Sequence, residues 1–191
     1  MNVKDINKEN SIIDKTLDIV FETGFAGLKM SILAKRVGIS PSTLYVYFET
    51  KEDLIIAIGI KIHQQIAARH RTVFSGAKTV KEQFYAKWKD MLVFMINNER
   101  EINFLDQLKQ SPYQDKIPIS IWENSIKMKT ALFDKGKKSG EIKDLDNKVI
   151  MFVIGGMVNQ TAELIKLGIF SMKEESLQEA FSLVWDALSK K

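Results

Sequence analysis

The stretch that decides the fold of this chain is LAKRVGISPSTLYVYF, residues 33–48. Helical periodicity predicts two short helices, at residues 31–37 and 41–48, with a three-residue turn between them. Gly38 opens that turn and can adopt the positive φ that a sharp turn requires. Two helices joined in this way are typical of a helix-turn-helix, although structural helical hairpins also contain glycine.

The second helix of the motif has a marked start and an apolar face. Pro41 follows Ser40, which is the favoured order for a first helical residue and its N-cap. Leu44 and Phe48 lie four residues apart and face inward, and the small Ala34 lets the two helices approach closely. We expect these side chains to form the core of the motif together with Leu33, Val37 and Ile39.

The outward face of the second helix is rich in hydroxyl groups and aromatic rings. At 100° per residue it holds Ser42, Thr43, Tyr45, Val46 and Tyr47. Hydroxyl groups reach phosphates or base edges, and a small apolar group can contact a thymine methyl. This composition is unusual for a solvated face, and it indicates a helix that lies in the major groove of DNA.

Basic residues exceed acidic ones around the motif. Lys29, Lys35, Arg36 and Lys51 stand against Glu49 in this stretch. Neutralising DNA phosphates requires such a local excess of positive charge. The net charge of the whole chain is +4, which permits an anionic partner without requiring one.

The remainder of the chain also predicts helices. The first is expected at residues 11–23, after the N-cap residues Asn10 and Ser11 and before a left-handed stop at Gly24. A fourth helix begins near Lys51. Longer amphipathic segments follow at residues 79–98, 101–110, 118–139, 147–167 and 173–189. The prediction is an all-α protein of about nine helices, with a small N-terminal module and a larger C-terminal bundle.

Composition excludes several classes of protein. The 191 residues are 45% hydrophobic and 27% charged, as in ordinary globular domains. The absence of cysteine excludes disulfide scaffolds, cysteine-ligated zinc and thiol nucleophiles. The longest apolar stretch, residues 149–158, is shorter than the roughly 18 residues that cross a bilayer, and the polar N-terminus is not a signal peptide. The expectation is a cytoplasmic protein without membrane contact.

From about Ile12 to Ile62 the sequence resembles the TetR family of bacterial transcriptional regulators. The residues that carry the resemblance are Gly24-Phe25, Leu33-Ala34, Gly38-Ile39-Ser40, Thr43-Leu44-Tyr45, Tyr47-Phe48 and Lys51-Glu52-Asp53-Leu54. The resemblance implies a helix-turn-helix DNA-binding domain at residues 7–67, with the fourth helix as connector. It also implies a ligand-binding and dimerisation domain at residues 73–191.

The resemblance implies roles for single residues too. Lys29 stands where many members cap the second helix with Thr or Ser, and Ser42 stands where many have Gly. Ser31 can replace the missing cap. The residues expected to contact DNA, with the phosphate-binding lysine at the start of the fourth helix, are Lys29, Ser31, Arg36, Ser40, Pro41, Ser42, Thr43, Tyr45, Val46, Tyr47 and Lys51.

Methionine and aromatic residues recur through the C-terminal segments at helical spacing. Adaptable Met beside rigid rings can build a pliable apolar pocket, although such residues also form ordinary cores. Asn159 and Gln160 follow an apolar run and can supply polar groups to a pocket or to a solvated surface. The residues expected to line a cavity are Trp88, Met91, Met95, Phe104, Trp122, Met128, Phe152, Met157, Asn159 and Gln160.

The resemblance implies a homodimer that associates through the last two helices. Consecutive glycines permit the helices to approach closely, and apolar side chains offer contact across the interface. The residues expected there are Val153, Gly155, Gly156, Phe181, Val184, Trp185 and Leu188.

The sequence offers no catalytic, metal or cofactor site. It lacks the G-x-S-x-G, G-x-x-x-x-G-K-[ST], G-x-G-x-x-G and H-E-x-x-H motifs. His63 and His70 lie one heptad apart, but no carboxylate stands at metal-ligand spacing around them. We therefore expect no catalytic residue, no metal and no cofactor.

These observations together predict a ligand-responsive DNA-binding transcriptional regulator. We expect a homodimer that represses from a palindromic double-stranded operator and leaves it when a small hydrophobic or amphipathic effector binds. Two alternatives stay open: a small-molecule-binding helical protein that has lost DNA binding, and a helical enzyme built on the same body. The sequence does not identify the effector, the operator or the regulated genes.

Overall fold

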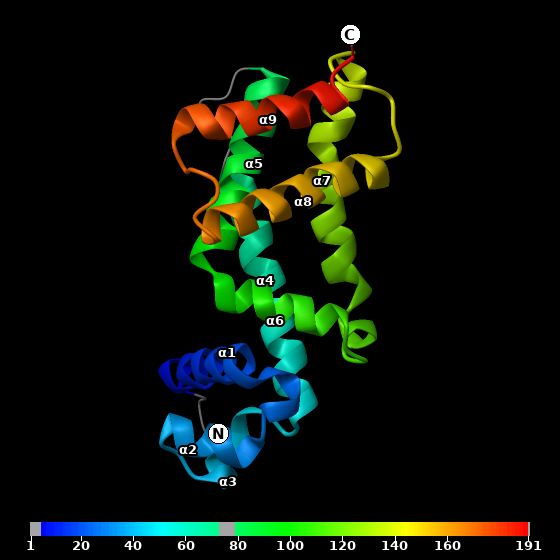
Figure 1. The fold of residues 1–191 in the computed structure, drawn as a ribbon. Helices are drawn as coiled ribbons and strands as arrows, with labels where there is room; N and C mark the ends of the chain where they lie inside the picture. Colours follow the sequence, from blue (N-terminus) through cyan, green and yellow to red (C-terminus); the bar gives the residue numbers. More distant parts are fainter. Residues whose placement is uncertain (1–4, 73–78, 191) are drawn as a thin grey trace. The chain divides into compact units, whose positions relative to one another are not determined.

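The chain is all-helical, as predicted (Figure 1). The structure, a computed structural model, describes residues 5–72 and 79–190, apart from the side chains at positions 70–72, 122, 124, 125, 128 and 129. Within those residues the α-helices are α1 (Ile6–Gly27), α2 (Met30–Val37), α3 (Pro41–Tyr47), α4 (Lys51–Thr72), α5 (Val80–Asn97), α6 (Glu99–Lys109), α7 (Ile119–Lys138), α8 (Asn147–Lys166) and α9 (Glu174–Leu188). A short 3-10 helix at Gln114–Lys116 was not predicted.

The predicted bounds of the first helix were wrong. Helix α1 begins at Ile6 rather than at Ser11, because the Asp5 carboxylate accepts a hydrogen bond from the backbone N–H of Asn7 at 2.9 Å and caps the helix there. Gly24 has a positive φ of 68°, which breaks the helical geometry as expected. The chain then resumes a helical turn and ends it at Gly27.

The chain divides into two compact units. The first contains α1 to α3, α4 up to Gln65, and the segment 99–121, which includes α6. The second contains the remainder of α4, α5 and α7 to α9. Helix α6, which belongs to the segment 73–191 expected to form the ligand-binding and dimerisation domain, packs with the N-terminal helices in this division.

Apolar contacts hold α6 in the first unit. Phe104 is fully buried, and its ring meets the ring of Phe25 edge-on at 5.0 Å between centroids. Tyr113, just beyond α6, meets the same Phe25 ring at 6.1 Å. Leu108 approaches Gly59 of α4 so closely that a Cβ at Gly59 would lie 2.6 Å from its Cδ2 atom. A larger residue at position 59 would force the end of the Leu108 side chain to shift.

The side-chain amide of Gln107 binds the backbone of α1 on both sides of the break at Gly24. Its Oε1 atom accepts a hydrogen bond from the N–H of Phe25 at 3.0 Å. Its Nε2 atom donates to the carbonyl of Val20 at 3.2 Å and to Oδ1 of Asn103 at 2.7 Å. A break in a helix frees backbone groups that must find other partners, and Gln107 supplies them.

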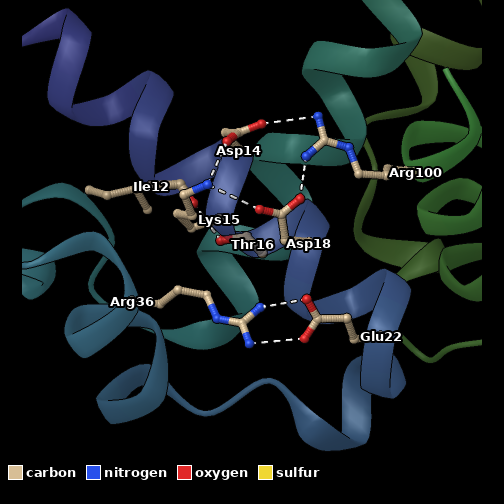
Figure 2. Close-up of polar contacts among 8 residues, drawn as sticks. All are labelled: Ile12, Asp14, Lys15, Thr16, Asp18, Glu22, Arg36 and Arg100. Atoms are coloured by element: carbon tan, nitrogen blue, oxygen red, sulfur yellow. Dashed lines mark hydrogen bonds and ion pairs between the residues drawn. The ribbon is translucent and has the colours of Figure 1, made fainter. Parts of the chain in front are cut away.

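Charged contacts also join α6 to α1 (Figure 2). Arg100 of α6 pairs with Asp14 at 3.0 Å and with Asp18, and Lys15 bridges the same two carboxylates at 3.2 and 3.1 Å. Burial alone would raise the pKa of Asp18, but hydrogen bonds from Arg100 and Lys15 outweigh it and lower that pKa. The α1–α6 contact therefore combines an apolar centre with an ionic margin.

The second unit has an aromatic core centred on α5. The ring of Phe84 stacks on Phe133 of α7 at 5.7 Å and meets Trp185 of α9 edge-on at 5.8 Å. Phe181 of α9 packs between two further rings of α5, at 5.1 Å from Tyr85 and 5.9 Å from Trp88. The inward face of α9 is thus used to close the core of its own unit.

A polar cluster fixes the start of α9 on α5. Tyr85 and Lys89 both donate hydrogen bonds to Glu174. The hydrogen bond from Lys89, followed by that from Tyr85, lowers the pKa of Glu174 to about 2, so this carboxylate is ionised at neutral pH.

Helix α8 has a second apolar side that the unit does not cover. Ile150, Val158 and Ala162 are buried, but the side chain of Phe152 is 80% exposed. Among the described helices, α8 is the one long and apolar enough to cross a membrane by length and composition, with a mean hydropathy of 1.2 over 18 residues, of which 17% are buried. The prediction of no such segment considered only the uninterrupted apolar run at 149–158.

Replacing Gln107 should test the contact between α6 and α1. Gln107→Ala leaves the N–H of Phe25 and the carbonyl of Val20 without their partners, so we expect the free energy of unfolding to fall by about 1–3 kcal/mol. Gln110→Ala, at an exposed position just after α6, should change it by less than about 0.5 kcal/mol. Urea unfolding followed by circular dichroism measures both. Equal effects at the two positions would contradict the role given to Gln107.

Candidate DNA-binding face and ligand cavity

Helices α2 and α3 form the predicted helix-turn-helix. Leu33, Ala34, Leu44 and Phe48 are buried, as their spacing predicted. Gly38 ends α2 in the left-handed conformation, with φ 78°, and its N–H bonds to the carbonyl of Ala34 at 3.0 Å. The turn that orients α3 therefore depends on the glycine identified from the sequence.

A cluster of hydroxyl groups marks the start of α3. Ser40 is the N-cap, and its Oγ atom accepts a hydrogen bond from the N–H of Thr43 at 3.1 Å. The same oxygen lies 2.8 Å from the hydroxyl oxygens of Ser42 and of Thr43, and Pro41 occupies the first turn. These hydroxyl groups are held in place before any ligand binds, which reduces the entropy cost of a contact with DNA.

The exposed side of α3 carries Ser42, Tyr45 and Val46. The side chain of Tyr45 is 48% exposed and that of Val46 is 56% exposed. Tyr47 is only half-buried, and its hydroxyl oxygen accepts a hydrogen bond from the N–H of Asp5 at 3.2 Å. Tyr45 and Val46 therefore present most of their surface to a partner, whereas Tyr47 also supports the start of α1.

Three of the four basic residues around the motif are exposed, namely Lys29, Lys35 and Arg36. Lys35 lies on α2, and Lys29 is the N-cap residue of that helix, where it makes no side-chain cap hydrogen bond. Ser31, the expected replacement cap, is exposed in the first turn. Lys29 and Lys35 are therefore the free-standing positive charges nearest to the motif in sequence.

Arg36 is exposed on α2 and pairs there with a carboxylate of α1 (Figure 2). Its guanidinium makes two hydrogen bonds of 2.9 Å to the two carboxylate oxygens of Glu22 on α1. These hydrogen bonds raise the pKa of Arg36, and the Glu22 carboxylate compensates its positive charge. The side chain thereby ties α2 to α1, and its contact with DNA stays a prediction.

Lys51 also has a partner inside the first unit. It opens α4, is half-buried, and donates a hydrogen bond to the carbonyl of Phe25 at the end of α1. Burial lowers the pKa of the Lys51 amine. Lys51 therefore joins α4 to α1 in addition to any contact with phosphate. Its replacement is expected to lower the stability of the first unit as well.

The second unit contains a cavity of about 150 Å³ between α5, α7 and α8. Its wall comprises Phe84, Lys87, Trp88, Met91, Leu132, Phe133, Met151, Ile154, Gly155, Val158 and Asn159. Trp88, Met91 and Asn159 were expected there from the sequence. Gly155, which was expected at the dimer interface, belongs to this wall. The sequence analysis missed Lys87, although a lysine one residue before a tryptophan in an apolar helix is a detectable signal.

Other residues expected in the cavity lie elsewhere. Phe104 is in the core of the first unit, Met95 is buried outside the wall, and Phe152 projects from the exposed side of α8. Met157 is half-buried and Gln160 exposed, and neither belongs to the wall. The side chains of Trp122 and Met128 lie outside the described residues.

Several residues expected at the dimer interface are also placed elsewhere. Phe181, Val184 and Leu188 are buried against their own unit, so they offer no surface to a second chain. Val153 and Trp185 are half-buried, and Gly156 is exposed. The open apolar residues nearest to them are Val149, Phe152 and Leu183. Helical periodicity identified the apolar positions of α9 but not which of them the fold covers.

The chemistry of the cavity is that of a binding site for an apolar molecule. Lys87 is the charged side chain in the described wall, and burial lowers the pKa of its amine. The Nε1 atom of Trp88 is buried without a hydrogen-bond partner in the described structure. No group of three His, Asp or Glu side chains within the described residues could hold a metal ion.

Comparisons with known proteins cover both units. Residues 12–58 match the family described as bacterial regulatory proteins, tetR family, and residues 60–190 match the family described as tetracyclin repressor-like, C-terminal domain. The fatty acid metabolism regulator protein of Bacillus subtilis is 27% identical over 163 residues, which are 81% of each chain.

Solved structures share the fold. A TetR family transcription regulator from Marinobacter aquaeolei superposes with a TM-score of 0.83 at 23% identity, over 96% of both chains. The fatty acid degradation regulator from Bacillus halodurans superposes with a TM-score of 0.77 at 19% identity, over 96% of this chain and 97% of that one.

Substitutions of the two tyrosines of α3 should distinguish a side chain that contacts DNA from one that stabilises the fold. Tyr45→Ala should weaken DNA binding by about 1–3 kcal/mol and change the free energy of unfolding by about 1 kcal/mol or less, because the ring is largely exposed. Tyr45→Phe, which removes only the hydroxyl, should lose less affinity. Tyr47→Ala should cost more stability than Tyr45→Ala, because Tyr47 is more buried. Fluorescence anisotropy and thermal melts on the same preparations measure these effects; a large stability loss with normal DNA binding for Tyr45→Ala would contradict the assignment.

Proposed function

The chain belongs to the TetR family of bacterial regulatory proteins, and we propose that it is a repressor that a small apolar or amphipathic molecule releases from its DNA operator. The observation that carries the DNA-binding part is the exposed face of α3, with Ser42, Tyr45 and Val46 beside a pre-formed cluster of hydroxyl groups. The cavity of the second unit supports the ligand-responsive part.

The protein acts on DNA as a dimer in this proposal. A single helix-turn-helix buries too little surface for useful specificity. The two helix-turn-helix motifs of a dimer therefore read two half-sites about 34–36 Å apart, or at a multiple of that spacing. A two-fold symmetric protein requires a palindromic operator. Its location is the cytoplasm, where the DNA of a bacterium lies.

The surface that joins the two chains is the uncovered side of α8 together with α9. Val149, Phe152 and Gly156 follow one another at helical spacing on α8, and Leu183 is exposed on α9. An exposed apolar stripe of this kind marks an interaction surface. A two-fold interface uses the same patch on both chains, so Phe152 of one chain contacts the corresponding patch of the other chain. This accounts for the hydropathy of α8 without a membrane.

Ligand release follows from differential affinity. The effector must bind more tightly to the conformation of the dimer that binds DNA less well, and a coupling of about 1–3 kcal/mol changes operator affinity roughly 5- to 150-fold. The chain passes between the two units at three places: within α4 at 65–66, at 98–99, and within α7 at 121–122. Because α4 contributes residues 51–65 to the first unit and 66–72 to the second, we expect the coupling to pass through it.

The names of two relatives support an apolar effector. One similar protein is a fatty acid metabolism regulator and one similar structure is a fatty acid degradation regulator. The family is one of transcriptional regulators, and the charged group in the cavity wall is a single lysine. Both points favour binding over catalysis, the alternative that the sequence left open.

Binding to the DNA upstream of its own gene tests the proposed function. Fluorescence anisotropy should show saturable binding of two chains per palindromic site, with an affinity that falls steeply as salt rises. A scrambled duplex of the same length and composition should bind at least about 10³-fold more weakly at equal salt. Equal affinity for the two duplexes would contradict the proposal.

The dimer surface has its own test. Phe152→Glu places a buried like-charge pair at the two-fold axis, so we expect the dimer dissociation constant to rise about 100-fold or more. Ile126→Glu makes the same change at an exposed apolar residue of α7 and should leave the dimer intact. Sedimentation velocity at micromolar concentration distinguishes the two. A wild-type monomer, or an intact Phe152→Glu dimer, would show that the chains associate elsewhere.

A further inference from the structure

We propose that the cavity between α5, α7 and α8 takes a compact apolar molecule that carries a carboxylate, with Lys87 as the residue that recognises the acid and Gly155 as the residue that limits its size. The inference rests on the proposed function, because it names the chemical class of the effector. It is carried by the chemistry of the cavity wall and by the space around Gly155.

The wall favours a ligand that is apolar along most of its length. Aromatic and aliphatic side chains from all three helices line it, among them Phe84, Leu132 and Ile154. Carbon surface of this kind binds a molecule in proportion to the apolar area that leaves water. A strongly polar body, such as a sugar, would lose its hydration without gaining partners.

The charge of the wall selects the functional group. Lys87 supplies a positive charge, and no acidic side chain belongs to the described wall. A cationic ligand would meet like charge, whereas a carboxylate would meet an ammonium group that is already partly removed from water. Burial lowers the pKa of the Lys87 amine, and a carboxylate within hydrogen-bond distance would raise that pKa. Charge-assisted hydrogen bonds of this type are the strong ones.

Two neutral polar groups accompany Lys87. Asn159 of α8 belongs to the wall, and the indole N–H of Trp88 is a buried donor without an acceptor among the described atoms. Buried donors are normally paired, so an unpaired one in a wall residue is consistent with a partner supplied by a ligand. The indole N–H, the Asn159 amide and the Lys87 ammonium can all donate hydrogen bonds. A ligand with acceptor oxygens complements all three.

The size of the cavity limits the ligand. A volume of about 150 Å³ equals that of an engineered cavity that holds benzene, so the apolar body has on the order of six to ten non-hydrogen atoms. Octanoate has this size. Longer acyl chains require the wall to open.

Gly155 keeps part of that volume free. A Cβ atom at this position would meet no heavy atom within 4 Å, so nothing in the local packing requires a glycine there. A helix with glycine in its interior is less stable than the same helix with alanine. The packing around position 155 does not explain why glycine is used there. The neighbouring Gly156 also has space for a Cβ atom, but it lies outside the wall.

The first experiment tests the recognition of the acid. Isothermal titration of the full chain at pH 7 compares octanoate, octan-1-ol and octylamine, which share one apolar chain. We expect octanoate to bind most tightly and octylamine least. Lys87→Met, which keeps the length and apolar stem of the side chain, should weaken octanoate about tenfold or more and leave octan-1-ol within about twofold.

Two variants control this result. Lys87→Arg retains the charge and should restore much of the preference for octanoate, and Lys138→Met, at an exposed lysine of α7, should bind like the wild type. Equal binding of octanoate and octan-1-ol, or an unchanged preference in Lys87→Met, would overturn the role of Lys87.

The second experiment tests the limit on size with straight-chain acids of four to sixteen carbons. We expect the best ligand of the wild type near eight carbons. Gly155→Leu fills the cavity with four carbon atoms and should shorten the preferred chain by about that number, and Gly155→Ala should have a smaller effect. Ala131→Leu, which adds carbon atoms at an exposed position of α7 outside the wall, should leave the preferred length unchanged. The same preferred length in Gly155→Leu, or tightest binding at sixteen carbons in the wild type, would overturn the assignment.

Measuring DNA binding alongside separates the two levels of the proposal. Octanoate that binds with the expected selectivity but releases no DNA supports the cavity assignment and contradicts the proposed function. DNA that binds specifically but is insensitive to every acid in the series, with no heat of binding, supports the operator assignment and overturns this inference. Thermal melts of each variant confirm that it is folded before either comparison.

Discussion

The break in α1 at Gly24 is the constraint on which the first unit depends. A helix that stops and resumes leaves backbone N–H and carbonyl groups without partners, and in this chain a single amide on α6, that of Gln107, binds them on both sides of the break. Phe104 and Arg100 extend the same contact with a buried ring and an ionic pair. A helix distant in sequence thereby becomes part of the DNA-binding unit, and the chain must enter that unit a second time to place it there.

Local signals in the sequence were sufficient for most of the fold. Gly38 and the Ser40-Pro41 pair each act within a few residues, through a positive φ and an N-cap, and the structure places both as predicted. The outward position of Tyr45 also follows from its angle relative to Leu44 on one short helix. These features depend on backbone geometry over one or two turns, which the sequence specifies directly.

Contacts between distant segments were not accessible in the same way. Arg36 pairs with Glu22, and Lys51 donates to the carbonyl of Phe25, so residues expected to contact phosphate also hold the first unit together; neither pair has a sequence signature. The two apolar helices α8 and α9 show the same limit. Periodicity marks Phe181 and Phe152 equally as apolar, but only tertiary packing decides that Phe181 is buried and Phe152 exposed.

Helix α8 serves two surfaces with neighbouring residues, since Gly155 lines the cavity while Gly156 and Phe152 lie on the uncovered side. A substitution on α8 that reshapes the cavity therefore also alters the shape of a helix on which association depends. The wall residues Phe84, Trp88 and Phe133 in turn belong to the aromatic core of the second unit, whereas Met91 of α5 is half-buried. Adaptation of this protein to a new effector, by natural drift or by directed evolution, is consequently least constrained at Met91, and diversification should accumulate there first.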